Sequence, residues 1–299
     1  MPVVCRPARL DDLKRADEIV VGSINELTER RGFGKMSSPR PPNFQAFSLA
    51  DDPAGLWVAE EDGEIVGFAW SWVCAELWFL AQLFVSPDRQ SDGIGNQLIS
   101  KAFAHAQMRG ASIRALITFA FNNVSQGLYI RHGLFPRCPV YMVSVSRDRL
   151  ASQLAEPKLH LDSLSDNTAA FEDLMLIDRY ALGVSREKHH RYLLDDRATS
   201  GFTIRDANEC VGYVYISDGH IGPLAVSRPG VMGAAFATAL SFAAQSKFPN
   251  ISAFLPGASE PALKTAMDHG MRISFPMLLM STREFGDWVS YLPRNPGFM

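Results

Sequence analysis

The chain has 299 residues, of which 47% are hydrophobic and 20% charged, and its formal net charge is -3. This length favours two domains with separate cores, and the composition excludes a disordered chain. The negative balance excludes the broad cationic surface that phosphate backbones require, so we expect no nucleic-acid partner. Four scattered cysteines, and charged residues where a secretory signal would be apolar, favour a cytoplasmic protein.

The first 60 residues predict opening helices, a loop and the start of a hairpin. Residues 30–52 contain several glycines and prolines and predict one long loop. Its phenylalanines, Phe33, Phe44 and Phe47, either line a pocket or anchor the loop. Two β-favouring runs, 55–60 and 65–70, flank turn residues and predict an antiparallel hairpin.

A strand over 78–85 leads into a glycine-containing turn and a helix that begins near Ile94. Pro87 ends the strand, and Gly93 and Gly95 allow the backbone to turn tightly. The first N–H groups of a helix have no intrahelical partners, so such a turn suits a pyrophosphate. The alternative is a strand-to-helix turn in which the glycines serve geometry alone.

The pattern then repeats along the chain. A strand over 113–117, a helix that ends at Gly133 and a strand over 140–145 complete the first half. The second half shows a hairpin over 201–215, strands over 224–227 and 251–255, and a second helix ending at Gly270. Five matches in one order predict two copies of one domain, 1–151 and 152–299. The expected class is α/β, with a mostly antiparallel mixed sheet flanked by helices in each copy.

Two motifs of the first copy resemble the GNAT superfamily of acyl-CoA N-acyltransferases. Gln90, Gly93 and Gly95 fit its Gln/Arg-x-x-Gly-x-Gly/Ala loop, and 122–134 is similar to its N-x-x-A-x-x-x-Y-x-x-x-G-F element. The resemblance implies acetyl-CoA as cosubstrate and no metal. It also implies a set of cofactor-binding residues, which are Leu83, Phe84, Val85, Gln90, Ser91, Asp92, Gly93, Ile94, Gly95, Asn96, Asn122, Ser125 and Tyr129.

The resemblance further implies how the chemistry proceeds. An amine attacks the thioester directly, a backbone N–H near Val85 stabilises the oxyanion, and Tyr129 protonates the departing thiolate. The family's usual carboxylate base is replaced by Gln82, so either Glu76 at the start of the strand or bulk water removes the proton. The adjacent His189 and His190 face different ways on a helix and do not predict a metal site.

The second copy lacks both functional elements. Its loop is shortened and contains Pro229, which has no N–H, and Ala266 stands where Tyr129 would be. The apolar stretch 229–246 predicts a buried helix rather than a membrane span. We therefore expect an N-acetyltransferase acting on a small-molecule or peptide amine through the first copy, as a monomer or homodimer. The alternatives are a noncatalytic acyl-CoA sensor or interaction module, and transfer of a longer acyl group.

Overall fold

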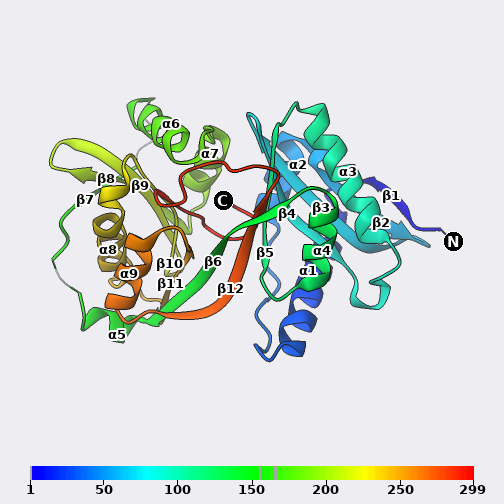
Figure 1. Ribbon diagram of the computed structural model, residues 1–299, viewed down its shortest axis with the longest axis horizontal. Helices are drawn as coiled ribbons and strands as arrows, with labels where there is room; N and C mark the ends of the chain where they lie inside the picture. The colour runs from blue at the N-terminus through cyan, green and yellow to red at the C-terminus, as the bar shows by residue number, and fades with distance from the viewer. Residues whose placement is uncertain (1, 155, 165–167) are drawn as a thin grey trace. The chain divides into compact units, whose positions relative to one another are not determined.

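The computed structural model describes residues 2–154, 156–164 and 168–299, which form two compact units (Figure 1). The first unit comprises residues up to Ile117 together with 121–135 and 281–283. The second comprises 118–120, 136–280 and 284–299. Among the helices of these described ranges, none is long and apolar enough to cross a membrane.

The first unit is a mixed sheet with strands in the order β1-β2-β3-β4-β5. Only β4 and β5 run parallel, and the other neighbours are antiparallel. Consecutive residues of β3 from Phe68 to Trp72 are buried, because helices cover the sheet. The elements are β1 (Val4–Pro7), α1 (Asp12–Arg30), α2 (Asn43–Asp51), β2 (Leu56–Glu61), β3 (Glu64–Cys74), β4 (Leu77–Val85), α3 (Ile94–Met108), β5 (Ile113–Phe119) and α4 (Asn123–Arg131).

The second unit is a mixed sheet in the order β12-β6-β11-β10-β9-β8-β7, and β13 pairs with β10. Helices α8 and α9 pack against each other, as Figure 1 shows. The elements are β6 (Phe135–Ser146), α5 (Arg147–Ala151), β7 (His160–Ser163), α6 (Thr168–Leu182), α7 (Glu187–Asp195), β8 (Thr199–Asp206), β9 (Glu209–Ser217), β10 (His220–Val226), α8 (Met232–Ala243), β11 (Asn250–Pro256), α9 (Glu260–Asp268), β12 (Arg272–Ser281) and β13 (Tyr291–Leu292).

The predicted class, a mixed α/β fold of tandem GNAT-like units with a mixed sheet flanked by helices, is confirmed, and both hairpins are present as β2–β3 and β8–β9. The single long loop over 30–52 is wrong, because α2 begins directly after Pro42. The glycines and prolines that disfavour a helix end at Pro42, and the nine residues that follow form one.

Strand β6 lies within the first copy of the repeat along the chain, but it pairs with β11 over the whole of Val140–Ser146 in the second unit. Nothing local in its sequence specifies this partner, since pairing in a sheet depends on distant residues. The division of the repeat after residue 151 stays a prediction.

The two units share one local geometry around the hairpin and the strand that follows it. Gly67 lies opposite Val85 in the first unit, and Gly212 lies opposite Val226 in the second. The next residue donates the same backbone hydrogen bond in each, from Ser86 N to Val66 O and from Ser227 N to Val211 O. This correspondence allows the two units to be compared residue by residue.

Candidate functional site

The end of β4 has a free edge. The parallel ladder between β4 and β5 runs from Leu77–Ile113 to Leu80–Leu116 and stops there, so the last five residues of β4 continue without that partner. A register shift in the pairing with β3 places the extra residue Ala81 at this point. Such a bulge bends the strand and increases its twist. The two strands therefore diverge beyond Leu80 and Leu116.

The alternation of the backbone decides which groups face this free edge. Ser86 N bonds to β3, so Phe84 also faces β3, whereas Leu83 and Val85 direct their N–H and C=O groups away from it. The carbonyl of Val85 accepts hydrogen bonds from Ser23 Oγ (3.0 Å) and Gln90 Nε2 (3.2 Å). The remaining outward groups, among them the N–H of Val85, suit an extended ligand with amide groups.

Ser23 was not expected from the sequence. It is buried in the middle of α1 and joins that helix to the end of β4. Only its position among the apolar residues of α1, where a serine needs a hydrogen-bond partner, marks it in the sequence. The glutamine of the loop motif makes the second bond to the same carbonyl, so Gln90 helps to fix the turn.

Ion pairs hold the turn between β4 and α3. Arg89 bonds to Glu61 at the end of β2 and to Asp92 Oδ2 (3.1 Å). Ser91 and Asp92 are exposed. Two residues of the turn, Ser91 (φ 79°) and Gly93 (φ 80°), have left-handed backbone conformations. Such a conformation costs a residue with a Cβ about 1–2 kcal/mol, which is why glycine suits position 93.

Gly93 is the N-cap of α3 and has no side chain that could cap the first amides. Asn96 N bonds to Gly93 O, and the amides of Ile94 and Gly95 precede this first intrahelical bond. A Cβ on Gly93 would have no other atom within 4 Å, so the protein leaves space above this turn. Free amides, the helix dipole and open space together suit an anion such as a pyrophosphate.

The side chains of two other predicted residues of the turn, Ile94 and Asn96, contact the protein itself. Ile94 is buried in the core, and the side chain of Asn96 bonds to His132 Nε2 (2.9 Å). The pairing of Asn96 with His132 links α3 to the end of α4.

The second predicted motif forms the start and the body of α4. Asn122 caps this helix by accepting a hydrogen bond from Ser125 N (3.2 Å). Tyr129 is 5% exposed, and its hydroxyl forms a hydrogen bond with the side chain of Ser125. Burial raises the pKa of Tyr129 far above its ordinary value, and the bond with Ser125 opposes the rise only in part. The phenol therefore keeps its proton, as a general acid must.

Glu76 lies apart from these residues. It is exposed in the turn before β4, and its carbonyl accepts a hydrogen bond from Ile113 N. Leu83 lies six positions after Leu77 along the extended strand, a distance of about 20 Å. The structure does not bring Glu76 to the end of β4 where the other predicted residues gather.

Two neutral side chains of helix α2 contact β3 and β4. Gln45 Nε2 donates to Gln82 Oε1 (3.4 Å), and Phe44 contacts Trp70 edge to face at 5.0 Å between ring centroids. Trp70 lies opposite Gln82 in the sheet. Phe33 stacks on Phe121 at 4.8 Å, close to the start of α4. No cluster of three metal-ligating side chains occurs among the described residues.

Comparison with known proteins gives the family. The acetyltransferase (GNAT) family matches residues 23–134. An uncharacterized N-acetyltransferase of Archaeoglobus fulgidus is 34% identical over 121 residues, which cover 37% of this chain and 78% of that protein. Mycothiol acetyltransferase of Streptomyces coelicolor is 37% identical over 84 residues, but these span only 27% of each chain.

Two solved structures resemble the whole chain. A putative acetyltransferase from Pyrococcus horikoshii has a TM-score of 0.78 at 15% identity and covers 99% of this chain and 96% of its own. A tandem GNAT protein from the clavulanic acid biosynthesis pathway has a TM-score of 0.63 at 15% identity, with 94% and 98% covered. At these identities the likeness establishes the fold. With the matches in sequence, it shows that this chain belongs to the GNAT family of acetyltransferases.

Proposed function

We propose that the first unit binds acetyl-CoA and transfers its acetyl group to a primary amine of a small molecule or peptide. One observation carries this proposal: a strand edge without a partner and a helix N-terminus with free amides meet at one turn. The pantetheine arm is an extended chain with two amides, and the pyrophosphate is an anion. The free edge of β4 suits the first, and the turn over 90–96 suits the second.

Bound acetyl-CoA supplies an acetyl thioester, and the residues of the first unit act on it as follows. Leu83 and Val85 hold the arm through outward backbone groups, and the amides after Gly93 hold the phosphates. A second outward backbone N–H at this end of β4 stabilises negative charge on the thioester oxygen. Tyr129, kept protonated by its burial, gives its proton to the thiolate as the amine takes the acetyl group.

The mechanism uses water rather than Glu76 to remove the proton from the amine. Glu76 lies about 20 Å along the strand, and the nearer position carries the neutral Gln82. Without an enzyme carboxylate, the fraction of the amine substrate that is neutral and reactive depends on the pKa of that amine. We expect kcat/KM to rise about tenfold per pH unit until that pKa is reached. Initial rates over a pH series check this, and a plateau set by an acid of pKa near 6 contradicts it.

A screen of primary amines with detection of free thiol tests the function. Release of CoA that depends on the amine, with one acetylated product for each thiol, is the expected result. Binding of acetyl-CoA without thiol release across small amines, peptides and protein N-termini would instead favour a sensor. Comparing acetyl-CoA with longer acyl-CoA esters in the same assay determines which acyl groups are accepted.

Acetyl-CoA is expected to bind at one site per chain. Only the first unit has the loop with Gly93 and a tyrosine at the position of Tyr129, whereas the second has Pro229 and Ala266. Isothermal titration calorimetry measures the number of sites. Two sites of equal affinity would show that the second unit retains binding despite these differences.

A further inference from the structure

The second unit retains the strand divergence of the first. Its parallel ladder between β10 and β11 ends at Ile221 and Ala253, the counterparts of Leu80 and Leu116. Beyond this point the last residues of β10 again lose β11 as a partner. We call the gap between the diverging strands the slot. Under the proposed function, the slot of the first unit accepts the pantetheine arm, and the second unit contains a second copy of it.

In the second unit another part of the chain occupies this slot. Strand β13 pairs antiparallel with β10, with Leu292 opposite Leu224 and Tyr291 opposite Ala225. Val226 N donates to Ser290 O at 3.0 Å. Val226 corresponds to Val85, whose N–H faces the slot of the first unit. The backbone donor assigned to the pantetheine arm in one unit is therefore bonded to a peptide carbonyl in the other.

The opposite side of the slot also contacts this segment. Ser259, fully buried at the N-cap of α9, donates its hydroxyl to Val289 O at 2.9 Å. Ser259 holds the position of Asn122, which the resemblance to the family assigns to the cofactor site. Contacts therefore reach the segment from the strand side and from the helix side, as expected for an occupant of the slot.

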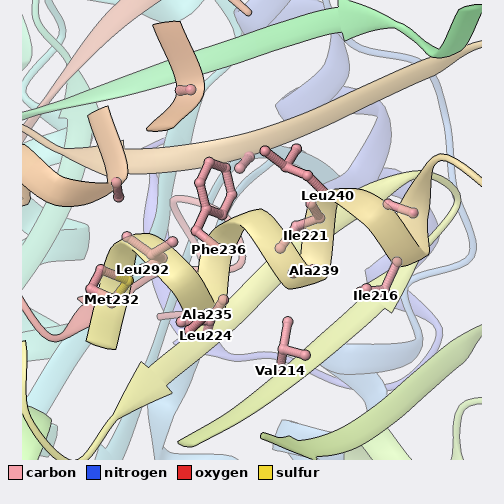
Figure 2. Close-up of a cluster of buried hydrophobic side chains, with 14 of the residues drawn as sticks. Val214, Ile216, Ile221, Leu224, Met232, Ala235, Phe236, Ala239, Leu240 and Leu292 are labelled. Carbon is pink, nitrogen blue, oxygen red and sulfur yellow. The ribbon is translucent and has the colours of Figure 1, made fainter. Parts of the chain in front are cut away.

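Apolar packing buries the side chains of the segment that contains β13. Leu292 is fully buried and belongs to the same core cluster of the second unit as Leu224 and Met232, and Figure 2 shows it near Met232. Tyr291 is also fully buried, and the guanidinium of Arg186 lies 5.0 Å from the centre of its ring. A segment held by core side chains on neighbouring residues is an integral part of the unit.

The residues after β13 are held as well. Arg294 donates to Gly222 O (3.2 Å) and to Ser217 Oγ (2.8 Å). A Cβ on Gly222 would lie 2.8 Å from Pro293 O, so glycine is needed there for the close approach of the two backbones. The strand β10 and its surroundings are thus shaped to fit residues 289–294.

We propose that Val289–Leu292 is a built-in occupant of the second unit's slot, where it replaces the pantetheine arm of a ligand. This proposal rests on the proposed function only for the identity of the ligand that it replaces. Its consequence is that the second unit is closed to acetyl-CoA by its own chain, in addition to lacking the loop and the tyrosine. The segment stabilises this unit as a permanently bound ligand would.

Hydrogen exchange measured amide by amide in the full chain tests the proposal. In the absence of ligand, the amide of Val226 is expected to exchange at least about tenfold more slowly than that of Val85, since only Val226 has an intramolecular acceptor. With saturating acetyl-CoA, exchange at Val85 slows and exchange at Val226 stays as it was. Equal exchange of the two amides without ligand would overturn the proposal, as would slowing at Val226 on addition of acetyl-CoA.

The same measurement separates this proposal from the proposed function. If Val226 is slow without ligand and Val85 does not respond to acetyl-CoA, the assignment of the first unit fails while the intramolecular pairing stands.

A matched pair of variants tests the contact from α9. Ser259→Ala removes the hydroxyl that bonds to Val289 O and is expected to speed exchange at Val226 about fivefold. Ser241→Ala is the control, because Ser241 bonds only within α8, to Ala237 O. Equal exchange at Val226 in the two variants, each verified as folded by circular dichroism, would overturn the part of the proposal that concerns Ser259.

Discussion

Replacing Tyr129 by phenylalanine is expected to lower the single-turnover rate of acetyl transfer about 100- to 10,000-fold, the usual contribution of general-acid assistance. The ring is buried and packs as before, so the affinity for acetyl-CoA should change less than about threefold. Stopped-flow detection of the released thiol, with an acceptor whose chemical step limits the rate, measures the effect.

The environment of Tyr129 keeps its hydroxyl protonated over a wide pH range. Burial raises the pKa of Tyr129, so the phenol remains protonated throughout the range in which amines become neutral. The acid and the deprotonated amine therefore coexist over a wide range of alkaline pH. We expect no decline in the rate from ionisation of Tyr129 within that range.

The control for this variant is Tyr180→Phe, since Tyr180 is 49% exposed on α6 in the second unit. It should transfer acetyl groups at the wild-type rate. An unchanged single-turnover rate in Tyr129→Phe would remove Tyr129 from the mechanism and leave water as the acid.

The second large effect is expected for Gly93→Val, which should weaken acetyl-CoA binding about 10- to 100-fold. A Cβ at position 93 has open space around it, but the left-handed φ of 80° strains a β-branched residue. The turn will relax toward a conformation that suits valine and will move the first amides of α3. The loss corresponds to one or two hydrogen bonds to charged phosphates, measured by calorimetry.

Gly233→Val is the matched control in the second unit. A Cβ on Gly233 would lie 3.3 Å from Thr265 Oγ1, so the larger side chain should disturb the packing of α8 on α9. We expect a loss of about 1–3 kcal/mol in unfolding free energy and unchanged affinity for acetyl-CoA. If both folded variants lost affinity equally, the phosphate site could not be assigned to the turn at Gly93.

The sequence by itself determined the features that depend on neighbouring residues. The hairpins, the turn before α3 and the cap of α4 follow from glycine, proline and asparagine at fixed local spacings, and the family is recognised from the two motifs that they form. The repeat was visible for the same reason, since each copy preserves its local order. The roles of Tyr129 and of the turn at Gly93 remain predictions that the variants above test.

Only the tertiary structure decided which distant segments meet. It placed Glu76 at the far end of β4, joined Ser23 to the carbonyl of Val85, and paired β6 with β11. It also put β13 beside β10, although two residues of strand give almost no signal in a sequence. The physical reason is that backbone groups pair without regard to side-chain identity, so the partner of a strand edge is set by the packing of the whole unit.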